Sequence, residues 1–132
     1  MNPVLVDTSV WIRFLRGDGT RETGMLELLI ETGAAAVCGV VLCELYPLGG
    51  SIKVRQEADR FFRSLPVLPD PPELWKTVTG MRTACVTAGV KGIGLPDLVV
   101  AAVAVHNSAA LLSMDSHFQQ IRTAGTALSL AG

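Results

Sequence analysis

Four acidic residues, far apart in the sequence, have the chemistry of a metal site: Asp7, Glu44, Asp97 and Asp115. If the fold brings these carboxylates together without basic neighbours, they repel one another and their pKa values rise unless a divalent cation neutralises them. A site with only oxygen ligands favours Mg²⁺ or Mn²⁺ over zinc. Such a metal supplies water activation and charge stabilisation for phosphodiester cleavage. The four residues therefore indicate metal-assisted phosphoryl hydrolysis.

Three of these acids also have a purely structural explanation. Asp7, Asp97 and Asp115 each stand at a predicted helix start, where a side-chain oxygen accepts hydrogen bonds from free backbone N–H groups. Glu44 lacks this explanation, because it lies within an apolar helical segment and no basic residue is within one turn of it. A buried, ionised carboxylate there needs a cation, a basic partner or a cavity. The alternative is that this helix has a solvent-exposed side.

The elements that position the aspartates are a helix and two strands. Between Asp97 and Asp115 the sequence is almost uncharged, which predicts a buried helix followed by a short strand. Asp7 follows another short apolar run, at residues 4–6. Ligands of open α/β sheets bind beyond the carboxyl ends of the strands. We therefore expect the three aspartates to lie at one end of a sheet.

Helical and strand patterns alternate along the whole chain, which predicts an α/β domain with a mainly parallel central sheet. Helices are predicted at residues 8–17, 21–31, 40–48, about 51–65, about 73–90, from 96 onwards and around 118–122, and strands at 4–6, 34–38, 66–69, just before 115 and at 126–130. No repeat or linker interrupts this order. We expect residues 1–132 to form a single domain.

The overall composition is that of a protein with a large core and a nearly neutral charge. Hydrophobic residues make up 49% of the 132 positions, yet no apolar run reaches the roughly 18 residues of a membrane-spanning helix. No secretion signal is recognisable at the N-terminus, so a cytoplasmic location without membrane association is expected. The three cysteines form no metal-binding pair and are expected to be small core residues. With the four acids set aside, 11 basic residues face 8 acidic ones, a balance that permits a nucleic-acid partner.

Four motifs, in order and at fitting intervals, together resemble the PIN domain. They are VDTSVW at residues 6–11, CEL at 43–45, LPDLVVAAVA at 95–104 and LLSMDSHF at 111–118. The similarity covers essentially the whole chain and is greatest to the VapC-type toxin ribonucleases of toxin–antitoxin pairs. It implies a three-layer α/β/α fold.

The resemblance also implies a function. A PIN-like ribonuclease of this type is a Mg²⁺- or Mn²⁺-dependent endoribonuclease whose acidic positions match Asp7, Glu44, Asp97 and Asp115. It implies an RNA substrate, a homodimer, and a cognate antitoxin that lies against the early helices and blocks the site. Ser9 matches a supporting hydroxyl position, although a serine in a first helical turn needs no such role. The alternative is a non-catalytic PIN-fold module that binds protein or RNA.

Three further sets of residues have both a functional and a purely structural explanation. Ser113 matches the second hydroxyl position, with an ordinary strand-end serine as the alternative. Many members of the family carry a further acid two residues after the fourth, where this chain has His117, and we expect that histidine to be a solvated residue of a first helical turn. The arginines Arg13, Arg16 and Arg21 could form a basic rim for RNA, but solvated helix faces explain them equally.

Overall fold

The computed structural model describes residues 2–46 and 50–132. Its centre is a three-stranded parallel sheet of β1 (Val4–Val6), β2 (Ala35–Ala36) and β3 (Ala110–Leu112), in the order β2-β1-β3. In the register, Leu5 of β1 lies between Ala36 of β2 and Leu111 of β3. The central strand thus has a neighbour on both sides. The mainly parallel sheet expected from the sequence is confirmed.

Two further strands were expected, and each is reduced to one bridge. Val67 bridges Val37, and Leu130 bridges Leu111, both in parallel. Prolines flank the first of these segments, at Pro66 and Pro69, and a proline cannot donate a ladder hydrogen bond. The sheet is therefore narrower than the sequence pattern suggested.

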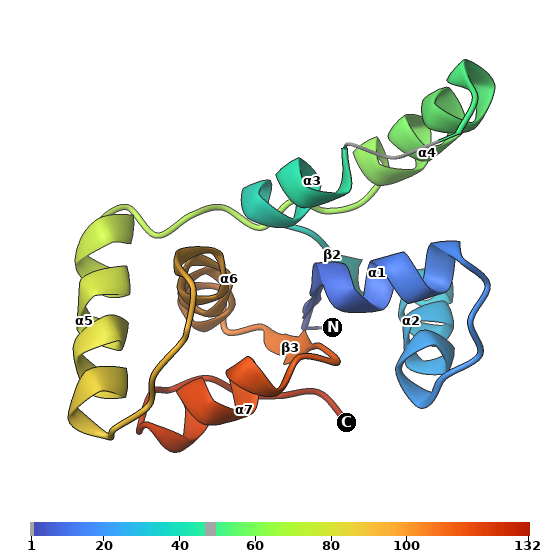
Figure 1. Cartoon of the computed structure of the whole chain (residues 1–132). Coiled ribbons are helices and arrows are strands. Elements are labelled where there is room, and N and C mark those ends of the chain that lie inside the picture. Colours follow the sequence, from blue (N-terminus) through green and yellow to red (C-terminus); the bar gives the residue numbers. More distant parts are fainter. Residues whose placement is uncertain (1, 47–49) are drawn as a thin grey trace.

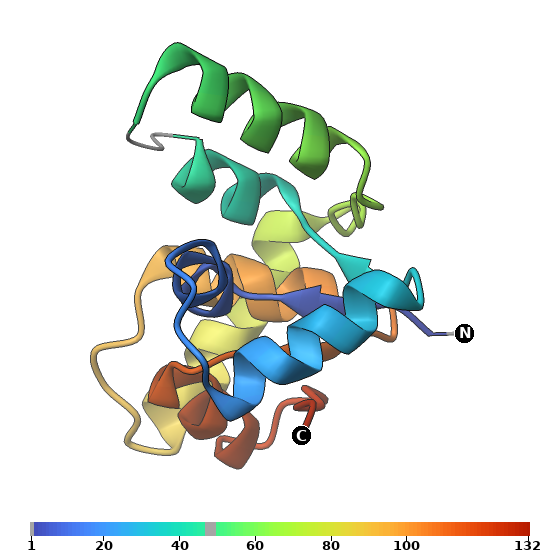
Figure 2. The ribbon, with the colours of Figure 1, turned by 90° about the vertical axis from the view of Figure 1, so that its right-hand side faces the viewer.

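Helices cover both faces of the sheet. They are α1 (Thr8–Leu15), α2 (Arg21–Glu31), α3 (Gly39–Leu45), α4 (Ile52–Arg63), α5 (Leu74–Thr87), α6 (Leu95–His106) and α7 (Ser116–Thr123). Figures 1 and 2 show α1 and α2 on one side of the strands and α5 and α6 on the other. The fold is a three-layer α/β/α arrangement. None of these helices is both long and apolar enough to cross a membrane.

Helix α6 is the most deeply buried helix of the fold. Every residue from Leu98 to Ala104 is buried, because α6 packs between α5 and the strand β3. Its small side chains, such as Ala101 and Ala102, let the neighbouring backbones approach closely. Pro96 stands in the first turn, where its fixed φ suits a helix start. This packing fixes the direction in which the N-terminus of α6 points.

Helix α4 lies farthest from the sheet, as an antiparallel partner of α3 (Figures 1 and 2). A cluster of aromatic rings attaches it to α1. Trp11 makes edge-to-face contacts with Phe14, Phe61 and Phe62, with ring centroids 5.2–6.1 Å apart. The indole N–H of Trp11 also donates to the carbonyl of Val6 at 3.1 Å. The cluster therefore ties α4 to α1 and to the end of β1.

Some sequence expectations need correction. The helix expected at 40–48 is described as Gly39–Leu45, and residues 47–49 lie outside the described part of the chain. Cys38 and Cys85 are buried as expected, but Cys43 is exposed, so the prediction that all three are core residues was wrong. Val41 and Leu45 of α3 face the core while Cys43 faces solvent. Only one side of α3 is therefore buried.

Candidate functional site

The two outer aspartates of the sequence follow adjacent parallel strands. Asp7 comes directly after β1 and Asp115 three residues after the end of β3, so both lie at the carboxyl edge of the sheet. The backbone N–H of Asp7 donates to the carbonyl of Leu112 at 2.9 Å, which continues the ladder between the strands. Asp97, in the first turn of α6, faces the same edge, because its carboxylate lies beside that of Asp115.

Asp7 is nearly buried, with 6% of its surface exposed, and it is the N-cap of α1. Its Oδ2 accepts hydrogen bonds from the backbone N–H of Ser9 at 3.3 Å, the hydroxyl of Ser9 at 2.8 Å and the hydroxyl of Ser113 at 3.0 Å. Three donors on one oxygen fix the orientation of the carboxylate. Asp7 therefore caps a helix and at the same time faces the carboxyl edge of the sheet.

The two serine hydroxyls join the strand ends to each other. Ser113 Oγ donates to Asp7 and accepts from the backbone N–H of Asp115 at 2.9 Å. Ser9 Oγ accepts from the backbone N–H of Met114 at 3.1 Å. The contacts from Ser113 to Asp7 and from Met114 to Ser9 span more than 100 positions of sequence and hold the loop after β3 against the start of α1. The serines are thus more than ordinary helix-start and strand-end residues.

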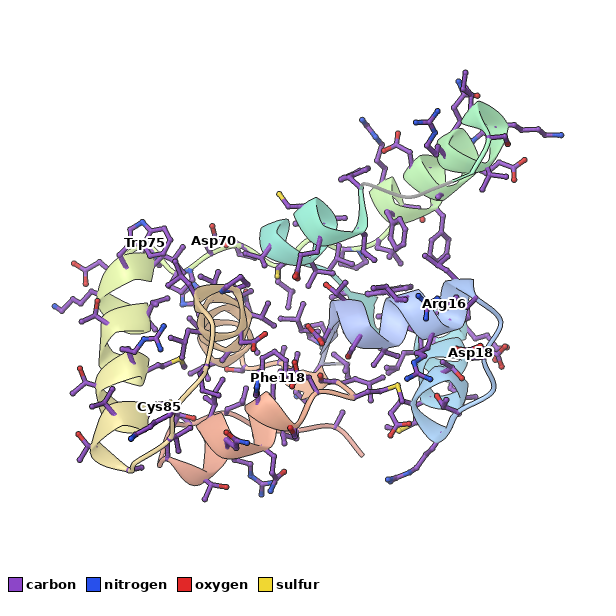
Figure 3. The ribbon with its side chains drawn as sticks, in the orientation of Figure 1. Arg16, Asp18, Asp70, Trp75, Cys85 and Phe118 are labelled. Atoms are coloured by element: carbon purple, nitrogen blue, oxygen red, sulfur yellow. The ribbon has the colours of Figure 1, made fainter. Side chains whose placement is uncertain are left out.

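Asp97, Asp115 and His117 form a compact cluster. Each offers a ligand atom, and these atoms all lie within 4.8 Å of one another. His117 Nδ1 lies 2.9 Å from Asp97 Oδ2 and 3.5 Å from Asp115 Oδ1. Asp115 is the N-cap of α7, because its Oδ1 accepts from the backbone N–H of His117 at 2.9 Å. Phe118, the next residue, points inwards from α7 and is buried, which fixes this helix start against the core (Figure 3).

The electrostatics of the cluster favour a bound cation. Burial, together with the negative charges of Asp115 and Asp7, raises the pKa of Asp97 although His117 hydrogen-bonds to it. The hydrogen bond to Asp97, helped by the charge of Asp115, raises the pKa of His117. Burial is the largest cause of the first shift and the hydrogen bond is the largest cause of the second, and neighbouring carboxylates add to both. Within the described residues, no lysine or arginine forms an ion pair with Asp7, Asp97 or Asp115.

Each of the three aspartates keeps one oxygen available. Asp7 Oδ1, Asp97 Oδ1 and Asp115 Oδ2 accept no hydrogen bond from the part of the chain that the structure describes. The second oxygen of each carboxylate is the one that holds the side chain in place. Oxygen donors of this kind, held in place and paired with no lysine or arginine of the described residues, suit a divalent cation. The donor set therefore fits a metal ion.

Glu44 is not part of this cluster. It lies on the exposed side of α3, and its Oε1 accepts a hydrogen bond from Thr8 Oγ1 at 2.9 Å. Of the two explanations left open for Glu44, the structure bears out a solvent-exposed side of the helix, because only one face of α3 packs on the core. Thr8 follows Asp7 directly, so Glu44 is held beside the first aspartate. It stands nearer to solvent than the other three acids.

His117 is the residue whose position the sequence interpretation missed. It was expected to be solvated, but its ring lies against Asp97, 20 positions away in the sequence. The available signal was its position two residues after Asp115, where many PIN domains carry an acid. A histidine there places a ring nitrogen beside the two carboxylates.

Comparisons with known proteins agree with the fold. The chain is 26% identical over 123 residues to the protein named ribonuclease VapC11 of Mycobacterium tuberculosis, which covers 89% of this chain and 90% of the relative. Among solved structures, it resembles VapBC2 of Rickettsia felis bound to a promoter DNA fragment (TM-score 0.75, 22% identity, 97% of this chain and 96% of that one). It also resembles VapBC-1 of nontypeable Haemophilus influenzae (TM-score 0.73, 16% identity, 97% and 96%).

The comparison with protein families covers nearly the whole chain. The PIN domain model matches residues 4–124, which span all three strands and all seven helices named above. The matched segment begins with β1, immediately before Asp7, and ends just after α7, which begins beside Asp115. The chain therefore belongs to the PIN domain family.

Proposed function

We propose that this protein is a metal-dependent endoribonuclease toxin that acts in the cytoplasm and is neutralised by a cognate antitoxin. The observation that carries the proposal is the set of three aspartates at the carboxyl edge of the sheet. Asp97 and Asp115 share one compact cluster, and the serine hydroxyls hold Asp7 beside it. In the described residues, each of the three has an oxygen that accepts no hydrogen bond, and none pairs with a lysine or arginine. A protein that used this edge only as scaffold would gain nothing from such self-repulsion. The similarity to proteins named VapC ribonuclease supports RNA as the substrate.

The residues proposed to hold the metal are Asp7, Asp97 and Asp115, with Glu44 at the solvent side. The ion is Mg²⁺ or Mn²⁺, because the ligands are carboxylate oxygens. When bound, it supplies activation of water and stabilisation of the charge that develops on a cleaved phosphodiester. The protein contributes rigidity: the hydroxyls of Ser9 and Ser113 fix Asp7 in one orientation. Such supporting hydrogen bonds keep ligands in place before the metal arrives.

Two partners follow from the same comparisons. The VapBC structures that this chain resembles support a cognate antitoxin as a binding partner. A homodimer is also proposed, from the resemblance of the four sequence motifs to VapC-type proteins. Neither proposal depends on the details of the acidic site, so each needs its own measurement.

A non-catalytic PIN-fold module that binds protein or RNA is the second candidate. It would have the same fold and the same surface, but it would bind its partner without cleaving RNA. The free carboxylate oxygens favour the enzyme over this alternative. A test must therefore measure cleavage and not only binding.

The test is RNA cleavage by the purified protein without antitoxin. We expect cleavage in Mg²⁺ or Mn²⁺ and none in EDTA. Asp7→Asn and Asp97→Asn should each lower kcat/KM by about 100-fold or more, since each removes a ligand charge and an oxygen donor. Asp70→Asn is the matched control, because Asp70 is exposed on the segment before α5 (Figure 3). Cleavage that persists in both Asp7→Asn and Asp97→Asn would refute the site.

A further inference from the structure

A cavity of about 390 Å³ lies directly beside the acidic site. Its walls come from the start of α2, the loop after β3, α7 and the C-terminal residues, and Figure 1 shows the C-terminal end between α7 and α2. Ser113 and Asp115 belong both to this cavity and to the acidic site. The cavity and the site are therefore continuous, with the loop at residues 113–115 as their common wall.

Two arginines line the cavity, one from α2 and one from α7. Arg21 is the first residue of α2, and Arg122 lies in the last turn of α7. The N-terminal end of a helix carries a partial positive charge, so the cationic side chain of Arg21 destabilises the start of α2. Neither arginine forms an ion pair with an acidic side chain in residues 2–46 and 50–132. Arg21 donates only to the backbone carbonyl of Gly132, at 2.8 Å.

The remaining lining combines polar groups with an apolar floor. Ser116 and Gln119 add hydrogen-bonding groups from α7, while Leu111, Phe118 and Leu130 supply apolar surface. Two acids, Glu22 and Asp115, also line the cavity, and Asp115 belongs to the proposed metal site. With Asp115 neutralised there, two guanidinium groups face one carboxylate. Guanidinium groups bind phosphate oxygens through paired, charge-assisted hydrogen bonds.

We propose that this cavity binds one nucleotide of a single-stranded RNA, adjacent to the phosphodiester at the acidic site. Arg21 and Arg122 contact its phosphate, and the apolar floor contacts its sugar or base. The volume suits a ligand of that size. This inference rests on the proposed ribonuclease function and adds to it a place where the strand is held. It also explains how a chain of net charge -1 can bind a polyanion, because the favourable charge is local.

The experiment measures RNA binding by the wild-type protein and its arginine variants in Mn²⁺, with an RNA analogue that cannot be cleaved, so that the acidic site keeps its metal. Fluorescence anisotropy with a labelled single-stranded RNA of about 12 nucleotides is recorded at several salt concentrations. Arg21→Gln and Arg122→Gln should each weaken binding about tenfold and lower the slope of log K against log salt by about 1. Arg60→Gln is the control, because Arg60 is exposed on α4, outside the cavity lining, and loses the same charge.

Conservative variants separate phosphate binding from a loss of fold. Arg122→Lys and Arg21→Lys keep the charge, so they should retain most of the salt slope while losing some affinity. Thermal unfolding of every variant identifies any that do not fold. If a glutamine variant does not fold, the lysine variant at the same position shows whether the arginine binds phosphate. If both glutamine variants bind RNA as Arg60→Gln does, or if the lysine variants lose the salt slope entirely, the nucleotide subsite is wrong.

The same proteins distinguish this inference from the proposed function. Wild-type protein that fails to cleave RNA in Mg²⁺ or Mn²⁺, while the two glutamine variants still weaken RNA binding, refutes the enzyme and retains the subsite. Wild-type protein that cleaves RNA, with the glutamine variants unchanged in affinity and in KM, refutes the subsite and retains the enzyme.

Discussion

At the scale of single residues, capping a helix and offering a metal ligand turn out to be compatible roles. Asp7 and Asp115 are both N-caps, and each uses one oxygen for the hydrogen bond to its helix. The other oxygen of each carboxylate remains free, because a carboxylate has two acceptor oxygens. A carboxylate that caps a helix can therefore also serve as a metal ligand. What distinguishes the site is that a partly buried carboxylate, Asp97, lies close to Asp115 and His117.

Asp97→Asn should not destabilise the metal-free protein. Burial and two neighbouring acids raise the pKa of Asp97, so neutralising this side chain removes repulsion. In EDTA we expect a Tm equal to that of the wild type or higher. Adding Mn²⁺ should raise the Tm of the wild type and leave that of the variant nearly unchanged. Thermal unfolding with and without metal measures both effects. A large fall in Tm in EDTA would instead mean that Asp97 serves mainly to stabilise α6.

His117 should influence which metal binds. Mg²⁺ prefers oxygen ligands, whereas divalent first-row transition metals also accept imidazole nitrogen. We expect Mn²⁺ to raise the Tm of the wild type more than Mg²⁺ does at the same concentration. His117→Asp, which places an acid at this position, should reduce the difference between the Tm increases caused by Mn²⁺ and by Mg²⁺. Gln119→Glu is a control that adds an acid elsewhere on α7. An unchanged difference in His117→Asp would exclude the histidine from the metal's surroundings.

At the scale of elements, two strand ends and two helix starts converge because of how each element is buried. The buried length of α6 fixes the position of Asp97, and Phe118 anchors the start of α7 beside it. Ser113 then joins the end of β3 to the start of α1 through Asp7. Helix α4 contributes nothing to this convergence. It is attached through the aromatic cluster, of which Phe62 is the most buried member from α4.

Phe62→Ala should lower the free energy of unfolding by about 3–5 kcal/mol, because it removes a buried ring and leaves a cavity beside Trp11. Val54→Ala on the same helix is the control, with an expected change below about 0.5 kcal/mol since Val54 is 53% exposed. Urea denaturation measures both values. In Phe62→Ala, the backbone amide hydrogens of α4 should exchange with solvent faster than those of α6. Equal losses in the two variants would mean that the cluster does not hold α4.

At the scale of the whole molecule, the distribution of charge matters more than its total. The net charge is -1, yet the acids of the site and the arginines of the cavity lie side by side. A metal ion at the acids would turn this edge from repelling RNA to attracting it. Several large apolar side chains, among them Trp75 and Val86 of α5, remain exposed on other parts of the described surface. Exposed apolar side chains of this size are common at contacts between subunits.

We predict that the protein is a homodimer in solution. Analytical ultracentrifugation at micromolar concentration should give twice the 14.0 kDa of one chain. The mass should not change with EDTA or in Asp97→Asn, because the acidic site is not expected to form the interface. A single species with the mass of one chain at these concentrations would rule the dimer out. A mass that changed with EDTA would place the metal site at the interface.

Local patterns in the sequence predicted the order and type of the elements and the acids that follow them. Apolar periodicity placed all seven helices and the three strands, because burial and hydrogen-bonding patterns are local in sequence. It also brought Asp97 and Asp115 into the same expected site. It predicted two outer strands that the structure reduces to one bridge each, because a short segment forms a strand only where a neighbouring strand edge is available for pairing.

The side chains that meet at that site depend on how the elements pack against one another. The side of α3 that faces solvent depends on how the helix packs, so Glu44 proved to be exposed. The ring of His117 lies against Asp97, and Ser113 lies against Asp7 across 106 positions. Arg21 and Arg122 share a cavity although 101 residues separate them in the chain. Contacts of this kind depend on the direction in which each buried element is fixed, and no local pattern in the sequence records that direction.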